Sequence, residues 1–235
     1  GLDIRRYRAG SSDEAALGSM LTSHGVDVVL DIGANSGQFG KMLRRAGYAG
    51  RIVSFEPLSA ARAALCATAA GDALWEVADR MAIGDRNGEI ELNISRNSVS
   101  SSVLPMLNAH LHAAPESEYI DRERVPLRTL QAAAAGYAVP PSVPFLKIDT
   151  QGYEDKVLAG AGELLERAIG LQLELSFVPL YEGQRQYGEM MDALKRLRFD
   201  IWYLSPAFID PITGRLLQVD ATLFRTASKH PEPQP

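Results

Sequence analysis

The sequence predicts an α/β fold built around a doubly wound, mostly parallel sheet of seven strands. Short β-branched runs alternate with segments of helical periodicity along most of the chain. Several of these runs are apolar throughout, as in strands that are buried on both faces. The 235 residues, 46% of them hydrophobic, suffice for one large core. We therefore expect one domain over residues 1–228, which includes an insertion at about 85–144, and a flexible tail at 229–235.

The first part of the chain pairs each expected strand with a helix. A short helix is expected over residues 13–24, and the run "VDVVLDIG" after it is typical of a central parallel strand. The segment "SGQFGKMLRRAGYAG" has the spacing of an amphipathic helix that ends at Gly47. "RIVSFEP" is expected to be the second strand, and a helix over residues 59–70 follows it. "LWEVADRMAI" contains the third strand region, and "GDRNGEIELNIS" is interpreted as a hairpin that turns at its Asn-Gly pair.

The remaining strands come after the polar insertion. It contains Ser98 and a serine run at 100–102, which form either a lid or a flexible linker, and a strand and turn at "RVPLRTLQ". After it, we expect "PFLKIDTQG" to be the fourth strand, "YEDKVLAGAGELLERA" one helix, "GLQLELSF" the fifth strand and "YGEMMDALKRLRF" another helix. "DIWYLSPAFID" and "RLLQVDATLFR", joined through "PITG", predict a final hairpin that places one strand antiparallel to the others.

Composition narrows the class of partner and the compartment. The net charge of −5 and the lack of any Lys or Arg run argue against nucleic acid as the substrate. Cys66 is the sole cysteine, so no internal disulfide can form, and its Ala-rich surroundings predict a buried side chain. No segment reaches the roughly 18 apolar residues of a membrane span, and we expect a cytoplasmic protein. No metal site is expected, and the oligomeric state stays open, a homodimer being one alternative.

The turn after the first expected strand carries the strongest functional signal. In an open α/β sheet, ligands bind beyond the carboxyl ends of the strands, where glycines allow close backbone approach and a helix N-terminus faces the crevice. "VVLDIGANSGQFGKML" has Asn35 and Met42 where a P-loop needs its first glycine and its hydroxyl residue. Asn35 and Gln38 also stand where a dinucleotide fingerprint has its second and third glycines. Neither nucleotide-binding motif matches this loop.

The sequence motif D-x-G-x-N-x-G, which begins at Asp31, is similar to the motif in the first loop of S-adenosylmethionine-dependent methyltransferases. The blocks "LDIGANSGQFG", "IVSFEP" and "FLKIDTQGYEDKVLAG" follow one another as in the FkbM-like methyltransferases, and this resemblance runs from about Val28 to Arg225. It implies a Rossmann-like class I methyltransferase fold with S-adenosylmethionine as the cofactor. The third block of the family usually has Glu where this chain has Gln151, a departure that argues against a required carboxylate at that position.

The resemblance also implies which residues bind the cofactor. Gly33, Asn35 and Gly37 would line its methionine part, and Glu56 would hold the two ribose hydroxyls. Chemistry supports the role of Glu56 independently, because a strand-end carboxylate can accept two hydroxyl hydrogen bonds at once; a solvated acid is the alternative. The full set of expected cofactor-binding residues is Asp31, Gly33, Ala34, Asn35, Gly37, Glu56, Pro57, Ala82 and Asp149.

Three residues are candidates for the catalytic step. Asp149 comes at the carboxyl end of the fourth strand, beside the expected position of the transferred methyl group, and Glu174 would border the acceptor pocket. His110, in the insertion, could deprotonate a hydroxyl near neutral pH, and a solvated loop histidine is the alternative. Lys147 is expected to neutralise either Glu174 or Asp149 across the sheet, a structural role that competes with catalysis.

The resemblance implies O-methyl transfer, since FkbM-like enzymes are associated with O-methylation of sugars and of secondary metabolites such as polyketides. The acceptor is therefore expected to be a hydroxyl of a sugar, glycolipid, polysaccharide or secondary metabolite, and the insertion at 85–144 would help to bind it. The fourth strand ends in "DTQG" rather than in the N/D-P-P-Y/F loop of methyltransferases that act on nucleobase amines. An NAD-type oxidoreductase and a non-catalytic cofactor-binding protein on the same fold remain as alternatives.

Overall fold

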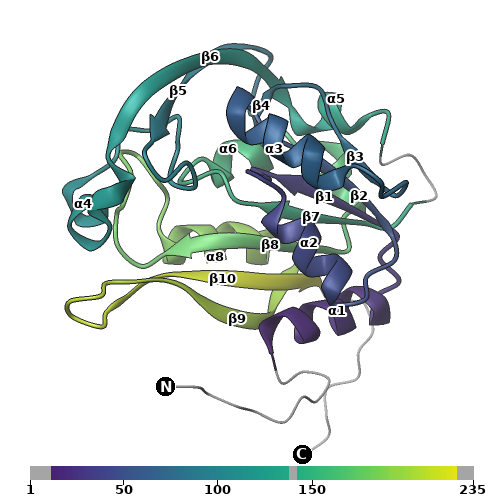
Figure 1. The fold of residues 1–235 in the computed structure, drawn as a ribbon. Coiled ribbons are helices and arrows are strands. Elements are labelled where there is room, and N and C mark those ends of the chain that lie inside the picture. The colour runs from purple at the N-terminus through teal and green to yellow at the C-terminus, as the bar shows by residue number, and fades with distance from the viewer. Residues whose placement is uncertain (1–11, 138–141, 227–235) are drawn as a thin grey trace, which may run out of the picture.

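A seven-stranded sheet forms the centre of the computed structural model, which describes residues 12–137 and 142–226. Its strands are β1 (Val28–Ile32), β2 (Arg51–Phe55), β3 (Trp75–Val77), β7 (Pro144–Ile148), β8 (Gly170–Ser176), β9 (Phe199–Ile209) and β10 (Leu216–Arg225). They lie in the order β3-β2-β1-β7-β8-β10-β9 (Figure 1). Neighbouring strands pair in parallel, except that β10 is antiparallel to both β8 and β9. The predicted sheet with a final antiparallel hairpin strand is confirmed.

Helices cover both faces of this sheet. They are α1 (Asp13–Ser23), α2 (Gln38–Arg45), α3 (Ser59–Ala69), α5 (Leu130–Ala134), α6 (Glu154–Ala159), α7 (Glu163–Arg167) and α8 (Tyr187–Arg196). Successive side chains of β1 point to opposite faces. Val29 belongs to a core cluster with residues of α1, α2 and α3, whereas Leu30 belongs to the cluster with residues of α5, α6, α7 and α8. Because β1 and β7 are buried along their whole length, their sequences are apolar almost throughout.

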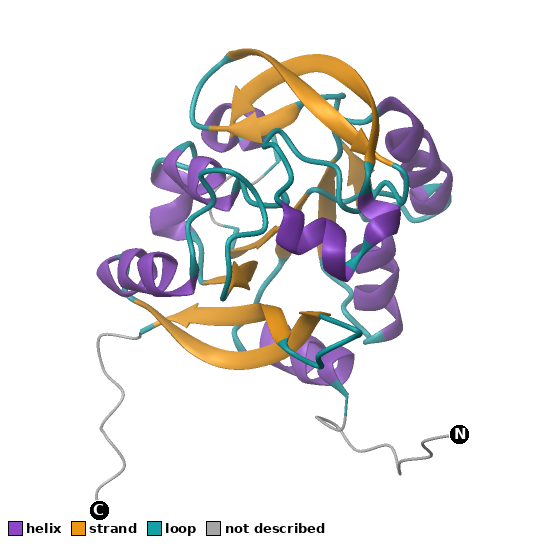
Figure 2. Ribbon diagram, turned by 90° about the vertical axis from the view of Figure 1, so that its left-hand side faces the viewer, coloured by secondary structure: helices purple, strands orange, loops and turns teal. Residues whose placement is uncertain are grey.

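A smaller sheet comes next in the chain after β3. It consists of β4 (Ala82–Gly84), β5 (Gly88–Ser95) and β6 (Tyr119–Thr129), in the order β4-β6-β5. A short helix, α4 (Asn108–Ala113), and a 3-10 turn (Pro115–Ser117) connect β5 to β6. Figure 2 shows the curved strands of this sheet at the opposite end of the molecule from the β9–β10 hairpin. A small core beside the main sheet joins the insertion to the start of α3 through Leu58 and Ala61.

The hairpin predicted at the Asn-Gly pair is wrong, because β4 and β5 both pair with β6 and not with each other. The Asn-Gly segment instead lies beside the end of β6, between β4 and β5. The N–H of Thr129 donates to Asn87 Oδ1 over 3.2 Å, and Gly88 lies opposite Leu127. The partner of β5 thus comes from far along the chain, where local turn chemistry carries no information. The predicted third strand region also splits, into β3 of the large sheet and β4 of the small one.

The single helix predicted over "YEDKVLAGAGELLERA" is also wrong, since the structure divides it into α6 and α7. Gly160 approaches β4 so closely that a Cβ at this position would lie 1.9 Å from the Gly84 carbonyl oxygen. Gly162 has a φ of +51°, which lies outside the helical region. Close packing on β4 therefore ends the first helix and turns the chain into the second.

Cys66 lies on the exposed side of α3, contrary to the expected burial. The buried side of that helix is formed by Ala61, Leu65 and Ala69 instead. The tail predicted at 229–235 lies outside the described residues, and the domain bounds stay a prediction. No helix within residues 12–137 and 142–226 is long and apolar enough to cross a membrane.

Two helical glycines provide a test of this packing. Gly40 in α2 faces Trp75 of β3, and a Cβ at position 40 would lie 2.2 Å from the indole ring. The ring is held in place by a hydrogen bond from its Nε1 to Ser54 Oγ (3.0 Å). Gly40→Ala is expected to lower the free energy of unfolding by about 1–3 kcal/mol, because extra atoms in a packed core force neighbours apart. Chemical denaturation measures this change.

Gly188 in α8 is the matched control, because it is exposed and a Cβ there would meet nothing within 4 Å. Gly188→Ala is expected to leave the free energy of unfolding unchanged or to raise it by up to about 1 kcal/mol, through helix propensity. A Gly40→Ala protein as stable as the wild type would contradict the close packing of α2 on Trp75.

Candidate functional site

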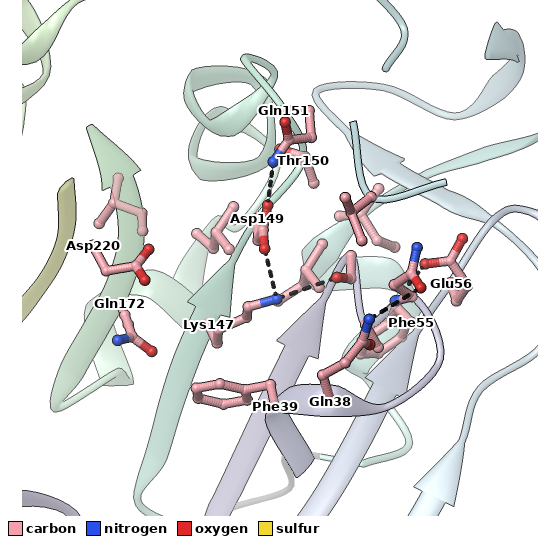
Figure 3. Close-up of a pocket in the computed structure, with 18 of the residues that line it drawn as sticks. Gln38, Phe39, Phe55, Glu56, Lys147, Asp149, Thr150, Gln151, Gln172 and Asp220 are labelled. Atoms are coloured by element: carbon pink, nitrogen blue, oxygen red, sulfur yellow. Dashed lines mark hydrogen bonds and ion pairs between the residues drawn. The ribbon is translucent and has the colours of Figure 1, made fainter. Parts of the chain in front are cut away.

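A cavity of about 480 Å³ opens at the carboxyl ends of β1, β2 and β7. Ile32, Phe55 and Ile148, the last residues of these strands, line it. The strand order reverses here, since β2 and β3 lie on one side of β1 and β7 and β8 lie on the other. Ligands of open α/β sheets bind at such a switch point. The cavity is therefore the candidate functional site, and Figure 3 shows side chains that line it.

The loop after β1 allows close approach of the backbone. Gly33 has a φ of +80°, and a Cβ there would lie 1.8 Å from the Asp149 carbonyl oxygen, so only glycine fits between the ends of β1 and β7. Asn35 has a φ of +46°, and Gly37, with a φ of +90°, is the N-cap residue of α2. Gly33, Ala34 and Asn35 line the cavity. Gly37 faces α3 and β3 instead.

Lys147 of β7 connects the two strand ends electrostatically. Its ammonium lies 3.3 Å from a carboxylate oxygen of Asp31 and 3.2 Å from one of Asp149. It also donates to the Gly33 carbonyl oxygen over 3.2 Å. Burial lowers the pKa of Lys147, but the charges of Asp149 and Asp31 outweigh this effect and hold the pKa above its usual range. Asp31 is fully buried and accepts a hydrogen bond from Ser54, so it fixes Lys147 rather than lining the cavity.

Glu56 follows β2 and lines the cavity. It lies at a distance from the pair formed by Lys147 and Asp149 (Figure 3). Its two carboxylate oxygens accept hydrogen bonds from the backbone N–H groups of Asn35 (2.7 Å) and Leu58 (2.9 Å), and the residue is 4% exposed. Burial raises the pKa of Glu56 to about 7, against the opposing effect of these two hydrogen bonds. Each oxygen keeps a lone pair for a further donor. Glu56 therefore suits a ligand with neighbouring hydroxyl groups.

Asp149 directly follows β7 and lines the cavity, with 34% of its side chain exposed. One of its oxygens pairs with Lys147, and the other accepts a hydrogen bond from Gln151 Nε2 over 2.8 Å (Figure 3). The predicted pairing of Lys147 with Asp149 is confirmed. The cavity thus contains a carboxylate that is held from both oxygens and remains accessible.

Glu174 of β8 lies behind Gln151 and is not one of the residues that line the cavity. Its Oε2 accepts hydrogen bonds from Gln151 Nε2 (2.9 Å) and Gln218 Nε2 (3.2 Å). Burial, followed by the charges of neighbouring carboxylates, raises the pKa of Glu174 well above its usual range. The alternative in which Lys147 neutralises Glu174 is wrong, because the register of β7 and β8 places Lys147 opposite Gln172. Glu174 borders the site only through Gln151.

His110 of α4 lies away from the cavity. It is 3% exposed, and its ring packs against Tyr181 (5.2 Å between centroids) and Phe208 (5.0 Å). Burial lowers the pKa of His110 to about 4. The structure therefore does not bring His110 together with Asp149, and the alternative of a solvated loop histidine is also wrong. The sequence pattern did not predict helix α4. This helix places the His110 ring in contact with the rings of Tyr181 and Phe208.

The insertion contributes to the cavity through the loop after β5. Ser98, Ser101 and Ser102 line the cavity, and Asn35 Nδ2 donates to Ser98 Oγ over 3.3 Å. Ser98 thus contacts the loop after β1 and Ser102 the loop after β7, so this segment is no free linker. Ser98 (φ +60°), Asn35 and Gln151 share a left-handed backbone conformation that is uncommon for residues with a side chain. Strained residues of this kind concentrate at binding sites.

Sequence reasoning missed the polar far end of the cavity, where β8, β10 and β9 contribute. Gln172, Thr222 and Tyr203 lie next to one another across these three strands, and they line the cavity together with Asp220. Asp13 of α1 closes this end by accepting a hydrogen bond from the Tyr203 hydroxyl (2.7 Å). No local signal marks these positions, because only strand register brings them together.

Seven of the residues predicted to bind a cofactor line the cavity, and two lie behind it. The seven are Gly33, Ala34, Asn35, Glu56, Pro57, Ala82 and Asp149. Asp31 and Gly37 do not line the cavity. Asp31 pairs with Lys147, and Gly37 packs against α3 and β3. Among the residues that the structure describes, no group of three or more His, Cys, Asp or Glu side chains could hold a metal ion.

Comparison with solved structures gives weak matches. TehB from Haemophilus influenzae matches with a TM-score of 0.49 and 11% identity, over 90% of this chain and 62% of that chain. An rRNA methylase from Streptococcus thermophilus matches with a TM-score of 0.48 and 11% identity, over 95% of this chain and 100% of that chain. Neither match identifies an acceptor.

Sequence comparisons are more specific. The 2-O-methyltransferase NoeI of Sinorhizobium fredii is 31% identical over 180 residues, which cover 71% of this chain and 70% of that protein. A family model described as the methyltransferase FkbM domain matches residues 31–201, from the acid of β1 into β9. This match includes Gly33, Glu56 and Asp149 at the three strand ends that surround the cavity. The chain therefore belongs to the FkbM methyltransferase family.

Proposed function

We propose that the chain is an S-adenosylmethionine-dependent O-methyltransferase whose acceptor is a hydroxyl of a sugar, glycan, glycolipid or secondary metabolite. The observation that carries this proposal is one cavity at the strand ends that contains both Glu56, with free lone pairs, and Asp149, held beside Lys147. Membership of the FkbM family and the fold imply methyl transfer from S-adenosylmethionine. Transfer to oxygen is inferred from the relative NoeI, which is named a 2-O-methyltransferase.

The residues around the loop after β1 fit the cofactor that the family implies. Glu56 has a free lone pair on each carboxylate oxygen for the two ribose hydroxyls. Pro57, Leu58 and Ala82 supply an apolar wall suited to the adenine ring. Bound S-adenosylmethionine supplies a methyl group that its sulfonium has already activated. The protein's own residues then need to align the acceptor, exclude water and take a proton.

We assign Asp149 to the acceptor hydroxyl. Lys147 fixes one oxygen of its carboxylate and Gln151 the other, and each oxygen of this cavity-lining carboxylate retains a lone pair. Asp149 can therefore accept a hydrogen bond from the acceptor hydroxyl, orient its oxygen, and take its proton as the bond to the methyl group forms. Until Asp149 takes that proton, the ammonium of Lys147 offsets its charge.

The lining of the cavity supports a hydroxylated acceptor. Ser98, Ser101 and Ser102 of the insertion offer hydroxyl groups, and Gln172 and Asp220 offer an amide and a carboxylate. Groups of this kind are suited to hydrogen-bond the hydroxyls of a sugar. The insertion at 85–144 is accordingly proposed as the acceptor side of the site. Membership of a methyltransferase family leaves the NAD-type oxidoreductase without support.

The test of this function is a screen of glycan, glycolipid and polyketide acceptors with isotopically labelled methyl donor. Label is expected in an alkali-stable methyl ether, because an ether resists conditions that cleave a methyl ester. Binding of S-adenosylmethionine without transfer to any acceptor would favour the non-catalytic alternative. Label found only on nitrogen or in an ester would contradict transfer to a hydroxyl.

Glu56→Gln is expected to weaken the binding of S-adenosylmethionine by about 1.5–3 kcal/mol, the usual contribution of a hydrogen bond to a charged group. This corresponds to a dissociation constant roughly 10- to 150-fold higher. Because the pKa of Glu56 is about 7 and hydroxyl donors favour the ionised form, wild-type affinity is expected to rise from about pH 6 to about pH 8. The variant is expected to lose this pH dependence. Isothermal titration calorimetry at both pH values measures both effects.

Glu154→Gln is the matched control. Glu154 is also 4% exposed, and burial raises its pKa to about 7 as well, but it does not line the cavity. Its Oε1 accepts the backbone N–H groups of Thr150 and Gly152, an acceptor role that glutamine retains. Affinity is expected to stay within about twofold of the wild type and to keep its pH dependence. Wild-type affinity in folded Glu56→Gln would remove Glu56 from the cofactor site.

Asp149→Asn is expected to lower the rate of methyl transfer by roughly 10²–10⁴-fold, as the loss of a general base does. The affinity for S-adenosylmethionine is expected to change little, because Asp149 acts on the acceptor. Lys147 would still contact Asp31, over 3.3 Å, so the variant is expected to fold. Single-turnover rate, cofactor affinity and melting temperature are measured on the same preparation.

Asp155→Asn serves as the control for that variant. Asp155 pairs with Lys156 (3.7 Å) and Arg185 (3.5 Å) and does not line the cavity, so its loss is expected to leave the transfer rate unchanged. A folded Asp149→Asn protein with a near-normal rate would rule out Asp149 as the base. A sharp loss of melting temperature at a normal rate would restrict Asp149 to balancing the charge of Lys147.

A further inference from the structure

Gln151 lies between two carboxyl groups at the edge of the cavity. Its Nε2 donates to Asp149 Oδ1 over 2.8 Å and to Glu174 Oε2 over 2.9 Å. Its Oε1 accepts a hydrogen bond from the Tyr181 hydroxyl over 2.7 Å. Both hydrogens and the oxygen of the amide are therefore engaged. Figure 3 shows this amide directed at Asp149, on the side away from Lys147.

We propose that Gln151 is a positioning residue for methyl transfer, which holds the Asp149 carboxylate in the orientation that meets the acceptor hydroxyl. The inference rests on the proposed function and deepens it, because it says how Asp149 is kept in place. Gln151 acts through Asp149 and does not itself need to contact the acceptor.

In this chain a neutral donor suits the charges around position 151, where the usual family spelling has Glu. Two carboxylates that face the same point repel each other unless a donor lies between them, and the amide supplies one N–H to each. Burial, followed by the charges of Asp149 and Asp220, raises the pKa of Glu174 well above its usual range. Glu174 is thus harder to ionise than an ordinary glutamate, and Lys147 pairs with Asp149 instead. Gln151 can keep both groups in place without adding a charge.

The surrounding structure holds this amide rigidly. Gln151 has a φ of +54°, in the left-handed region, and Ser102 Oγ donates to its backbone carbonyl oxygen over 2.7 Å. Tyr181, which is fully buried, reaches the amide from the segment after β8. Two segments from distant parts of the chain thus hold one residue, Ser102 by its backbone and Tyr181 by its side chain. A strained backbone persists where the surroundings over-determine it, as at functional sites.

Two variants of the full chain remove the amide in different ways. Gln151→Met keeps the length of the side chain but has no donor, so transfer is expected to slow by roughly 10- to 100-fold at every pH. Gln151→Glu keeps an acceptor for Tyr181 and offers a donor only while it is protonated. Once ionised, it repels Asp149. Its rate relative to the wild type is therefore expected to fall, by roughly tenfold or more, between about pH 6 and about pH 9.

Gln218→Glu is the matched control. Gln218 also donates to Glu174 Oε2, over 3.2 Å, but its second contact is Ser176 and not Asp149. In both Glu variants the folded cluster binds a proton more tightly than the unfolded chain does, so melting temperature is expected to fall as the pH rises. Only Gln151→Glu is expected to lose methyl transfer as well, when rates are compared below the melting temperature of each variant. Affinity for S-adenosylmethionine is expected to stay within about twofold of the wild type in both variants.

The outcomes separate this inference from the proposed function. A wild-type protein that binds S-adenosylmethionine but methylates no acceptor would overturn the proposed function and the role of Gln151 with it. Wild-type transfer with normal rates in both Gln151 variants would overturn the role of Gln151 alone. Equal rate losses in Gln151→Glu and Gln218→Glu would do the same, because they would reflect a disturbed Glu174. A rate loss confined to the Gln151 variants, pH-dependent only for Gln151→Glu, supports the assignment.

Discussion

The ammonium of Lys147, shared by the carboxylates of Asp31 and Asp149, is the interaction on which the arrangement of the site depends. Asp31 belongs to β1 and Asp149 follows β7, so one cation connects the two strands between which the strand order reverses. A buried ion pair of this kind adds little net stability, but the loss of the shared Lys147 would leave the buried Asp31 uncompensated, at a cost of about 3–5 kcal/mol. Its effect is therefore to specify where two acids lie.

The same cation constrains the backbone around the cavity. Lys147 donates to the carbonyl of Gly33, and Gly33 lies so close to the Asp149 backbone that no side chain fits between them. Asn35 then turns the chain with a positive φ and gives its N–H to Glu56. The carboxylate proposed to bind the cofactor and the one proposed to meet the acceptor are thus held relative to each other by one short loop and one ion cluster.

Residues at strand ends could be predicted from the sequence, because both their position and their chemistry are local. Gly33, Glu56 and Asp149 each follow a recognisable strand, and parallel strands bring their carboxyl ends to one edge of the sheet. Glu174 and His110 could not be placed in this way, since their surroundings depend on strand register and on the packing of α4. The prediction of a hairpin at the Asn-Gly pair was wrong for the same reason, because β5 pairs with β6, which comes much later in the chain. Local pattern thus predicts which elements form, and long-range packing decides which side chains share a site.

The balance of charge at Asp149 also bears on how such a site can promote methyl transfer. An unpaired carboxylate beside a sulfonium would stabilise the charged reactant more than the transition state, in which that charge is dispersing, and would slow the chemical step. Pairing with Lys147, which Asp149 shares with Asp31, reduces this excess attraction. The hydrogen bond from Gln151 then sets the direction of a carboxylate that is already paired with Lys147. In the proposed reaction, Asp149 contributes by orienting the acceptor oxygen and accepting its proton, and its two partners keep it from stabilising the reactant instead.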